Sequence, residues 1–200
     1  MAIPLNYQIS EFDCGPVSLL NALNHQFDRR LIKPCIIKTI YSYSLDCCDN
    51  HSHPGYKGTS AAALRFMGEW MNEYGVKCGF PVYCESLSPG DIWLGEGSPL
   101  NAALDRGAVA VTRCLLEVGH YVLITGAQDG WCQLWDPYYL EKPIRKSTIR
   151  MVADQPAHCN RMVAYSQMNA AGKGYYNLGD VEKRECLLVF NTARSGEANR

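Results

Sequence analysis

Residues 118–138 read VGHYVLITGAQDGWCQLWDPY and hold the clearest strand signals in the chain. Two runs rich in β-branched and aromatic residues, His120–Gly126 and Trp131–Trp135, flank the turn-forming segment Ala127–Gly130. This spacing predicts an antiparallel hairpin, in which the end of the second strand returns towards the start of the first. His120 and Asp136 are therefore expected to lie side by side, although sixteen residues separate them in the chain.

The part of the chain before this hairpin has helical periodicity. A first helix is expected to start at Cys14, with Asp13 as its cap and Pro16 in its first turn. A second helix is expected over Ala61–Tyr74, and a short third helix over Leu100–Arg106.

The boundaries of these elements and the order of the strands complete the expected fold. Ser60 is expected to cap the second helix and Gly75 to end it, whereas Pro34 leaves residues 32–43 open to a helix or an extended run. Residues 44–59 are expected to form a loop. Helices followed by antiparallel strands predict an α+β fold. The further strands are expected over Cys78–Cys84, Ala108–Cys114, Arg161–Tyr165 and Glu185–Phe190.

The composition is that of a single globular domain over residues 1–200, with a disordered tail from about residue 195. Hydrophobic residues make up 47% of the chain and charged residues 20%, and the net charge is −1. This near-neutral charge argues against nucleic acid as a partner, and no apolar run is long enough to span a membrane. The N-terminus lacks a secretory pattern, so we expect a cytoplasmic protein whose ten cysteines are mostly free thiols.

Cys14 stands at a position that favours a reactive thiol, the start of the predicted first helix. Backbone N–H groups and the helix dipole favour a negative charge there, and the thiolate is the nucleophilic form of cysteine. Gly15 leaves room for a substrate or another backbone to approach the sulfur. Gln8, six residues before Cys14, is placed to offer its side-chain N–H to a developing oxyanion.

His120 and Asp136 supply the other groups that such a thiol needs. His120 stands at the start of a strongly apolar strand, and a cysteine and a histidine that share a proton act as nucleophile and general base. Asp136 follows the next strand and is expected to hold the tautomer and the orientation of the imidazole, as the third member of a triad does. The sequence therefore predicts a triad of Cys14, His120 and Asp136.

The order of these motifs, Gln8 before Asp-Cys14-Gly-Pro, then Gly-His120-Tyr-Val and then Asp136-Pro, resembles that of papain-like cysteine peptidases. It is most similar to the bacteriocin-processing group, which cleaves leader peptides after a double glycine, and to the stand-alone relatives of that group. The resemblance implies a papain-like fold, with N-terminal helices packed on an antiparallel sheet. It also implies a thiol protease, a hydrolase that cleaves a peptide or another amide through a thioester and needs no cofactor. Its nucleophile, base, orienting residue and oxyanion donor are Cys14, His120, Asp136 and Gln8.

Several other functions stay open at this point. The same triad serves acyl transfer to another amine or thiol and deamidation, and a protein of this fold also binds peptides without turnover. Cys14 taken alone fits a buried structural thiol. Substrate and oligomeric state are not determined by the sequence. Cys-and-His-rich residues of the loop form a weaker candidate for a metal site: Cys47, Cys48, His51 and His53. The sequence offers no second Cys-x-x-Cys pair to complete this site.

Overall fold

The computed structural model describes residues 3–195. The tail predicted to be disordered lies outside these residues, except for Ser195, which ends the last helix. Single 3-10 turns lie at Arg29–Leu31, Pro89–Asp91 and Val181–Lys183. The helices and strands are, in chain order, α1 (Cys14–Gln26), α2 (Pro34–Ser44), α3 (Ala61–Cys78), β1 (Val82–Ser86), α4 (Pro99–Asp105), β2 (Val109–Leu116), β3 (Val118–Gln128), β4 (Trp131–Trp135), β5 (Ile149–Met151), β6 (Arg161–Ala164), α5 (Tyr165–Met168), β7 (Tyr175–Asn177), β8 (Cys186–Asn191) and α6 (Thr192–Ser195).

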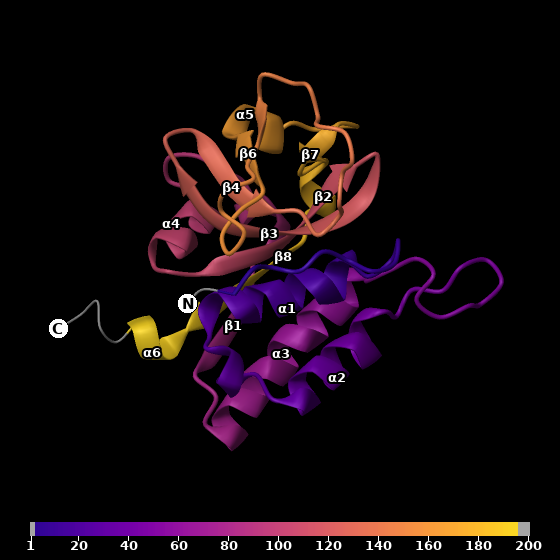
Figure 1. The fold of residues 1–200 in the computed structure, drawn as a ribbon, viewed down its shortest axis with the longest axis vertical. Coiled ribbons are helices and arrows are strands. Elements are labelled where there is room, and N and C mark those ends of the chain that lie inside the picture. Colours follow the sequence, from indigo (N-terminus) through magenta and orange to yellow (C-terminus); the bar gives the residue numbers. More distant parts are fainter. Residues whose placement is uncertain (1–2, 196–200) are drawn as a thin grey trace.

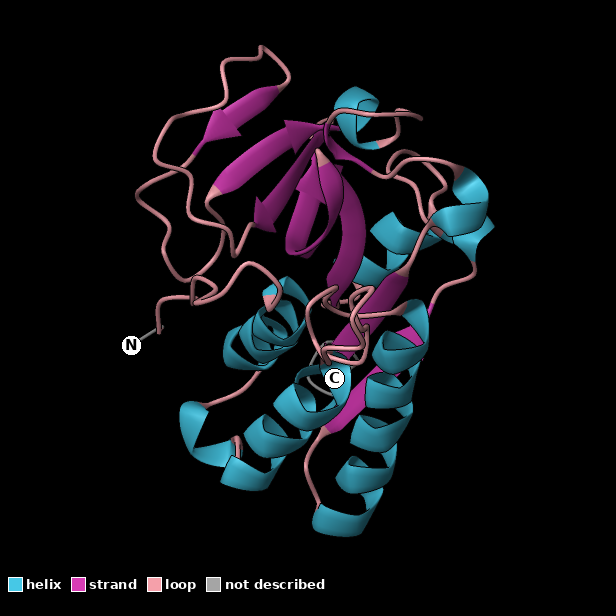
Figure 2. Cartoon of the chain, turned by 90° about the vertical axis from the view of Figure 1, so that its right-hand side faces the viewer, coloured by secondary structure: helices cyan, strands magenta, loops and turns pink. Residues whose placement is uncertain are grey.

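The helices α1 to α3 form one part of the molecule and most of the sheet forms the other (Figure 1). The strands are antiparallel neighbours in the order β1-β8-β2-β3-β4-β6-β5, and β7 pairs with β2. β8 therefore lies between β1 and β2, although it follows β2 by a long stretch of chain. Figure 2 shows the same division from the side, with the helical layer below the curved sheet. The molecule is an α+β protein, as predicted.

Two hydrophobic cores lie on opposite sides of the sheet. Tyr121 and Leu123 of β3 belong to the core that includes Leu23 of α1. The alternate residues Val122 and Ile124 belong to the second core, which includes residues of α4. This alternation follows from the geometry of a strand, in which successive side chains point to opposite faces. β3 thereby joins the helical layer to the rest of the sheet.

The helix starts agree with the predictions only in part. Ser60 caps α3, because its hydroxyl accepts a hydrogen bond of 3.1 Å from the backbone N–H of Ala63. Pro34 begins α2, where its missing N–H has no cost, so this ambiguous segment is a helix. Asp13 precedes α1, but its carboxylate does not cap the helix and accepts hydrogen bonds from the backbone of Ile9 and Ser10.

The end of α3 and the start of β1 differ from the predictions. α3 continues past Gly75 to Cys78 and is followed by Gly79, whose φ of +66° few other residues adopt. The predicted strand Cys78–Cys84 is thus wrong at its start, and β1 begins only at Val82. A Cβ on Gly75 would lie 2.9 Å from the carbonyl oxygen of Phe80. That glycine lets the chain after α3 return close to the helix, and it does not end the helix.

β3 and β4 form the predicted hairpin. Asp129 and Gly130 form the turn, and the pairing includes Leu123 with Trp135. This register brings the residue after β4, which is Asp136, towards the start of β3. Two short strands, β5 and β7, were not predicted, since three residues carry too little alternation to be recognised.

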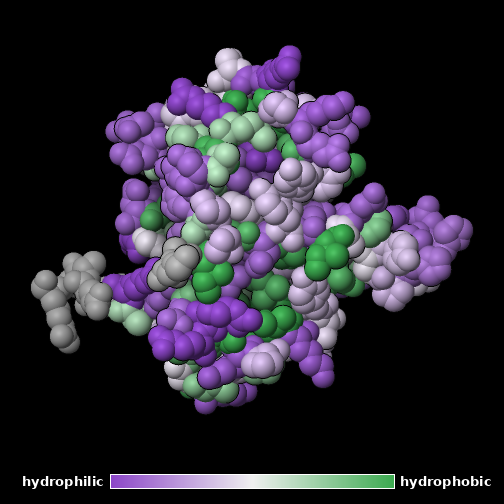
Figure 3. Space-filling model, in the orientation of Figure 1, coloured by the Kyte–Doolittle hydropathy of each residue, from purple (hydrophilic) through white to green (hydrophobic). Residues whose placement is uncertain are grey.

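The surface and the thiols agree with a globular protein. The face shown in Figure 3 is mostly hydrophilic, with hydrophobic residues in separate small groups. All ten cysteines are free thiols, and six of them are buried. Within residues 3–195, none of the helices combines the length and the hydropathy needed to cross a membrane.

Candidate active site

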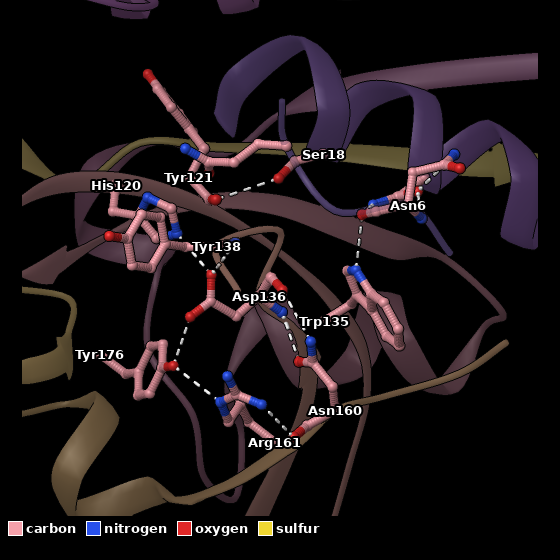
Figure 4. Close-up of polar contacts among 12 residues, drawn as sticks. Asn6, Ser18, His120, Tyr121, Trp135, Asp136, Tyr138, Asn160, Arg161 and Tyr176 are labelled. Atoms are coloured by element: carbon pink, nitrogen blue, oxygen red, sulfur yellow. Dashed lines mark hydrogen bonds and ion pairs between the residues drawn. The ribbon is translucent and has the colours of Figure 1, made fainter. Parts of the chain in front are cut away.

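α1 holds Cys14 against the strand that carries His120. Cys14 is the first residue of α1, and only 8% of its surface is exposed. One turn later, the buried hydroxyl of Ser18 donates a hydrogen bond of 3.1 Å to the carbonyl oxygen of Tyr121 (Figure 4). Tyr121 directly follows His120 on β3. This bond therefore fixes the first turn of α1 beside the imidazole.

The ring of His120 is held in turn by Asp136 (Figure 4). The His120 Nε2 atom lies 2.7 Å from the Asp136 Oδ1 atom, and both side chains are buried. Because Nε2 faces the carboxylate, Nδ1 is the ring nitrogen left to face Cys14. The thiol of Cys14 is close enough to act on the ring through a hydrogen bond and through charge. The structure thus brings together the three residues that the sequence analysis grouped as a triad.

Asp136 has no exposed surface, and its carboxylate is surrounded by hydrogen-bond donors. Oδ1 accepts a bond of 2.8 Å from the backbone N–H of Tyr138, in addition to that from His120. Oδ2 accepts a bond of 2.6 Å from the hydroxyl of Tyr176. The side chain of Asn160 bonds the backbone N–H and the carbonyl of Asp136, both at 2.8 Å. The orientation of the carboxylate is therefore determined by its surroundings.

Three residues of this network were not predicted from the sequence: Tyr176, Asn160 and Arg161. Arg161 is 4% exposed, and its Nε atom donates a bond of 3.2 Å to the Tyr176 hydroxyl, which links a buried guanidinium to Asp136 (Figure 4). Tyr176 is fully buried on the three-residue strand β7 and has a φ of +63°. A strained backbone of this kind persists only where the surrounding contacts require it. No pattern in the sequence signals such a conformation.

The electrostatics of the pair favour a charged imidazole. Burial alone lowers the pKa of His120, but the hydrogen bonds and charges of Asp136 and Cys14 outweigh it and raise the pKa from 6.5 to about 10. Burial likewise raises the pKa of Asp136, and the bonds from His120, Tyr176 and Tyr138 outweigh it and hold the pKa below 3.8. At neutral pH the geometry therefore supports an imidazolium between a carboxylate and the Cys14 sulfur.

Cys14 and His120 share the wall of a cavity of about 1090 Å³. The loop before α3 contributes Tyr56 and Thr59 to this wall, and the chain after β4 contributes Tyr138. The cavity is at least as large as the pockets of about 300–1,000 Å³ that commonly bind small molecules, so the candidate site has room for a ligand.

Gln8 also lines this cavity, and the chain around it is fixed next to the triad. Its backbone N–H donates a bond of 2.8 Å to the carbonyl of Pro137, the residue after Asp136. Its side-chain Nε2 donates a bond of 2.7 Å to the carbonyl of Ser10. The second N–H of this amide is the one that is left for an oxyanion, so the role of Gln8 stays a prediction.

Gly15 is in contact with Thr59 of the loop before α3. A Cβ on Gly15 would lie 2.1 Å from the Thr59 Oγ1 atom and 2.7 Å from its Cβ. The space beside the sulfur that the sequence analysis kept for a substrate or a backbone is thus partly filled by this side chain. The contact joins the start of α1 to the cavity wall.

We expect Gly15→Ala to lower the free energy of unfolding by about 1–3 kcal/mol, because the added methyl group displaces Thr59. Thermal unfolding measures this loss. Adding Thr59→Gly to Gly15→Ala should recover more of the stability than adding Thr59→Ala, because alanine keeps the Cβ that lies within 2.7 Å. Equal recovery by the two double variants would contradict this contact as the cause.

The weaker metal candidates lie on the loop between α2 and α3. The His53 Nδ1 atom lies within hydrogen-bond distance, 2.9 Å, of the Asp49 carboxylate, and the thiol of Cys47 faces Asp46. Cys48 is exposed. In the described part of the chain, no group of three His, Cys, Asp or Glu side chains lies close enough together to hold a metal ion. The predicted candidates Cys47, Cys48, His51 and His53 therefore do not form such a group.

No protein-family model matches the chain, and no curated protein is significantly similar to it in sequence.

Proposed function

We propose that this protein is a cysteine peptidase or amide hydrolase of the papain-like type, with Cys14 as nucleophile, His120 as acid and base, and Asp136 as the orienting residue. One observation carries the proposal. A single buried imidazole lies between a carboxylate that is 2.7 Å away and a thiol at the start of a helix, in the wall of an open cavity. A peptide is the proposed substrate.

The proposed chemistry is acyl transfer through a thioester. The Cys14 thiolate attacks the substrate carbonyl, and the resulting oxyanion accepts hydrogen bonds from the backbone N–H of Cys14 and the amide of Gln8. The C–N bond breaks as the imidazolium of His120 gives its proton to the departing amine. The neutral ring then takes a proton from water, whose oxygen attacks the thioester, so that the C–S bond breaks and a carboxylic acid and the Cys14 thiolate are released while the proton stays on His120.

The charges in the cavity wall favour a substrate without a strong net charge of either sign. The carboxylate of Glu185 accepts a bond from the Tyr121 hydroxyl and lies 3.9 Å from the Arg113 guanidinium. Acidic and basic residues are equally numerous in the wall, so a strongly charged substrate gains little from it. These residues are Glu11, Glu117, Glu185, Lys57, Arg113 and Lys183.

Comparison of Cys14→Ala with the wild type tests the proposal. We expect hydrolysis of a mixed peptide library to fall at least about 10³-fold, as happens when a nucleophile is removed. Iodoacetamide at pH 6, followed by peptide mass mapping, should alkylate Cys14 faster than the exposed Cys48, because ordinary thiols are protonated at that pH. Cys48→Ala is the matched control and should keep full activity.

The products distinguish the remaining alternatives. Hydrolysis yields a free acid whether or not an amine is added, whereas a transferase yields an amide that contains the added amine. Release of ammonia from glutamine side chains indicates a deamidase. An unreactive Cys14 together with peptide binding indicates a module without turnover and overturns the proposal.

The alkaline limit of kcat/KM is a further prediction of this mechanism. His120 must be protonated to give its proton to the leaving amine, and its pKa is raised to about 10. We therefore expect the activity to persist through pH 8 and to decline near pH 10, well above the range of an ordinary histidine. Initial rates measure this limit, with a return to pH 7 to exclude inactivation. A decline in activity centred near pH 6.5 would refute the role of a His120 imidazolium as the proton donor.

A further inference from the structure

Cys35 and Cys78 occupy the same end of the helical layer. α2 begins at Pro34 and α3 ends at Cys78, and the loop that joins these helices lies at their other end. Both cysteines are exposed. They are far from the proposed chemistry, because it is the joining loop that reaches the cavity, through Tyr56 and Thr59.

Both thiols lie near the same hydroxyl, that of Tyr74. The Cys35 Sγ atom is 3.5 Å from the Tyr74 hydroxyl. Cys78 follows Tyr74 by one helical turn on the same face of α3, so its thiol lies close enough to contribute to the raised pKa of that hydroxyl. Contact with Cys35, followed by burial and contact with Cys78, raises the pKa of Tyr74 to about 12. Two accessible thiols on different helices thus converge on a single oxygen.

We propose that Cys35 and Cys78 form a reversible disulfide that joins the start of α2 to the end of α3. Thiol–disulfide exchange with a small disulfide needs two sulfurs that are both accessible and close to each other. The exposed thiols at the shared end of α2 and α3 meet this requirement. The bond closes residues 35–78 into a covalent ring that includes the loop in the cavity wall.

The formation of this bond balances with glutathione disulfide as oxidant. One protein thiolate attacks glutathione disulfide, which forms a mixed disulfide and releases one glutathione thiolate. The second protein thiolate attacks the protein sulfur of that mixed disulfide, which forms the Cys35–Cys78 bond and releases a second glutathione thiolate. Two protein thiols are oxidised, and their two protons pass to the two glutathione thiolates.

The cross-link has a predictable thermodynamic effect. It limits the conformations of the unfolded chain over residues 35–78 and leaves the folded contacts in place. We expect oxidation to raise the Tm by roughly 5–15 °C. Because the bond lies at the far end of α2 and α3 from the cavity, the Cys35–Cys78 cross-link itself should leave the cavity around Cys14 unchanged.

The experiment uses the full chain at pH 8. The protein is incubated with reduced glutathione and glutathione disulfide, and the proportion of the disulfide is increased from one sample to the next. We expect trypsin to release residues 31–38 linked to residues 78–106, with a mass two hydrogen atoms below the sum of the two separate peptides. Cys84 also lies in the second peptide but is buried, so Cys78→Ser should abolish the link.

Matched variants separate this pair from the other exposed thiol. Cys35→Ser and Cys78→Ser should each remove the link and the increase in Tm, whereas Cys48→Ser should keep both. The wild-type peptide map stands even if a variant does not fold. Cys35 and Cys78 that stay free, or that each carry a separate glutathione, would overturn the proposal. Neither result bears on the reactivity of Cys14, so this inference and the proposed function fail independently.

Discussion

His120→Ala is expected to lower kcat/KM for peptide hydrolysis by about 10⁴-fold, a typical loss for a member of a catalytic triad. The variant removes the group that holds the proton between Cys14 and the leaving amine. It also removes the positive charge beside the sulfur, so we expect alkylation of Cys14 at pH 6 to become as slow as that of an ordinary thiol. Steady-state hydrolysis and peptide mapping after iodoacetamide measure the two effects.

His53→Ala is the matched control for this variant. His53 is exposed on the loop between α2 and α3 and pairs with Asp49, so its removal should leave both measurements unchanged. A thermal unfolding curve for His120→Ala shows whether the loss is chemical. Full alkylation of Cys14 at pH 6 in the folded His120→Ala protein would remove the imidazole from the mechanism.

Asp136→Asn is expected to have the largest effect on stability, on the order of 3 kcal/mol at pH 5–6. Asparagine keeps the shape of the side chain but removes its negative charge. That charge stabilises the His120 imidazolium and, through the hydroxyl of Tyr176, also faces the buried guanidinium of Arg161. The pKa of His120 should fall, because Asp136 is the first of the causes that raise it. The Tm measures the loss, which we expect to be roughly 6–12 °C.

The pH dependence of this loss follows from the two pKa shifts. The contribution of His120, whose pKa is raised, is fully present below about pH 6.5 and is lost as the pH rises through about 10. The contribution of Asp136, whose pKa is lowered, is present above about pH 4 and is lost as the pH falls through the folded value. The difference between wild type and Asp136→Asn should therefore be largest at about pH 4–6.5.

Tyr176→Phe keeps the charge of Asp136 and removes only one hydrogen bond, so we expect a smaller loss of about 1 kcal/mol. The alkaline limit of the activity should therefore stay near that of the wild type in Tyr176→Phe and move far down in Asp136→Asn. A pH-independent difference in Tm between wild type and Asp136→Asn would show that packing, and not the ion pair, causes the loss.

The elements predicted correctly depend on local signals. The cap at Ser60 and the turn at Asp129 and Gly130 each involve a few neighbouring residues whose conformation follows from their own chemistry. The grouping of His120 with Asp136 needed only the hairpin between them. The approach of Cys14 to this pair came from the order of the motifs, because no local signal links residues more than one hundred positions apart.

The features that were missed depend on distant contacts. Gly75 is typical of a helix end, yet it lies inside α3 because the chain after the helix approaches its Cα closely. Tyr176 completes the support of Asp136 from a three-residue strand with a φ of +63°, and the charge of Arg161 is buried behind it. Propensity describes a residue in isolation, so it does not report these contacts.

The position of β8 between β1 and β2 has a consequence for the newly made chain on the ribosome. The central sheet lacks an inner strand until Cys186–Asn191 has been synthesised, and the approach of Cys14 to His120 spans more than half of the chain. Contacts of this range form late in folding. We therefore expect the approach of Cys14 to His120 to be completed only after β8 has been synthesised and has joined the sheet.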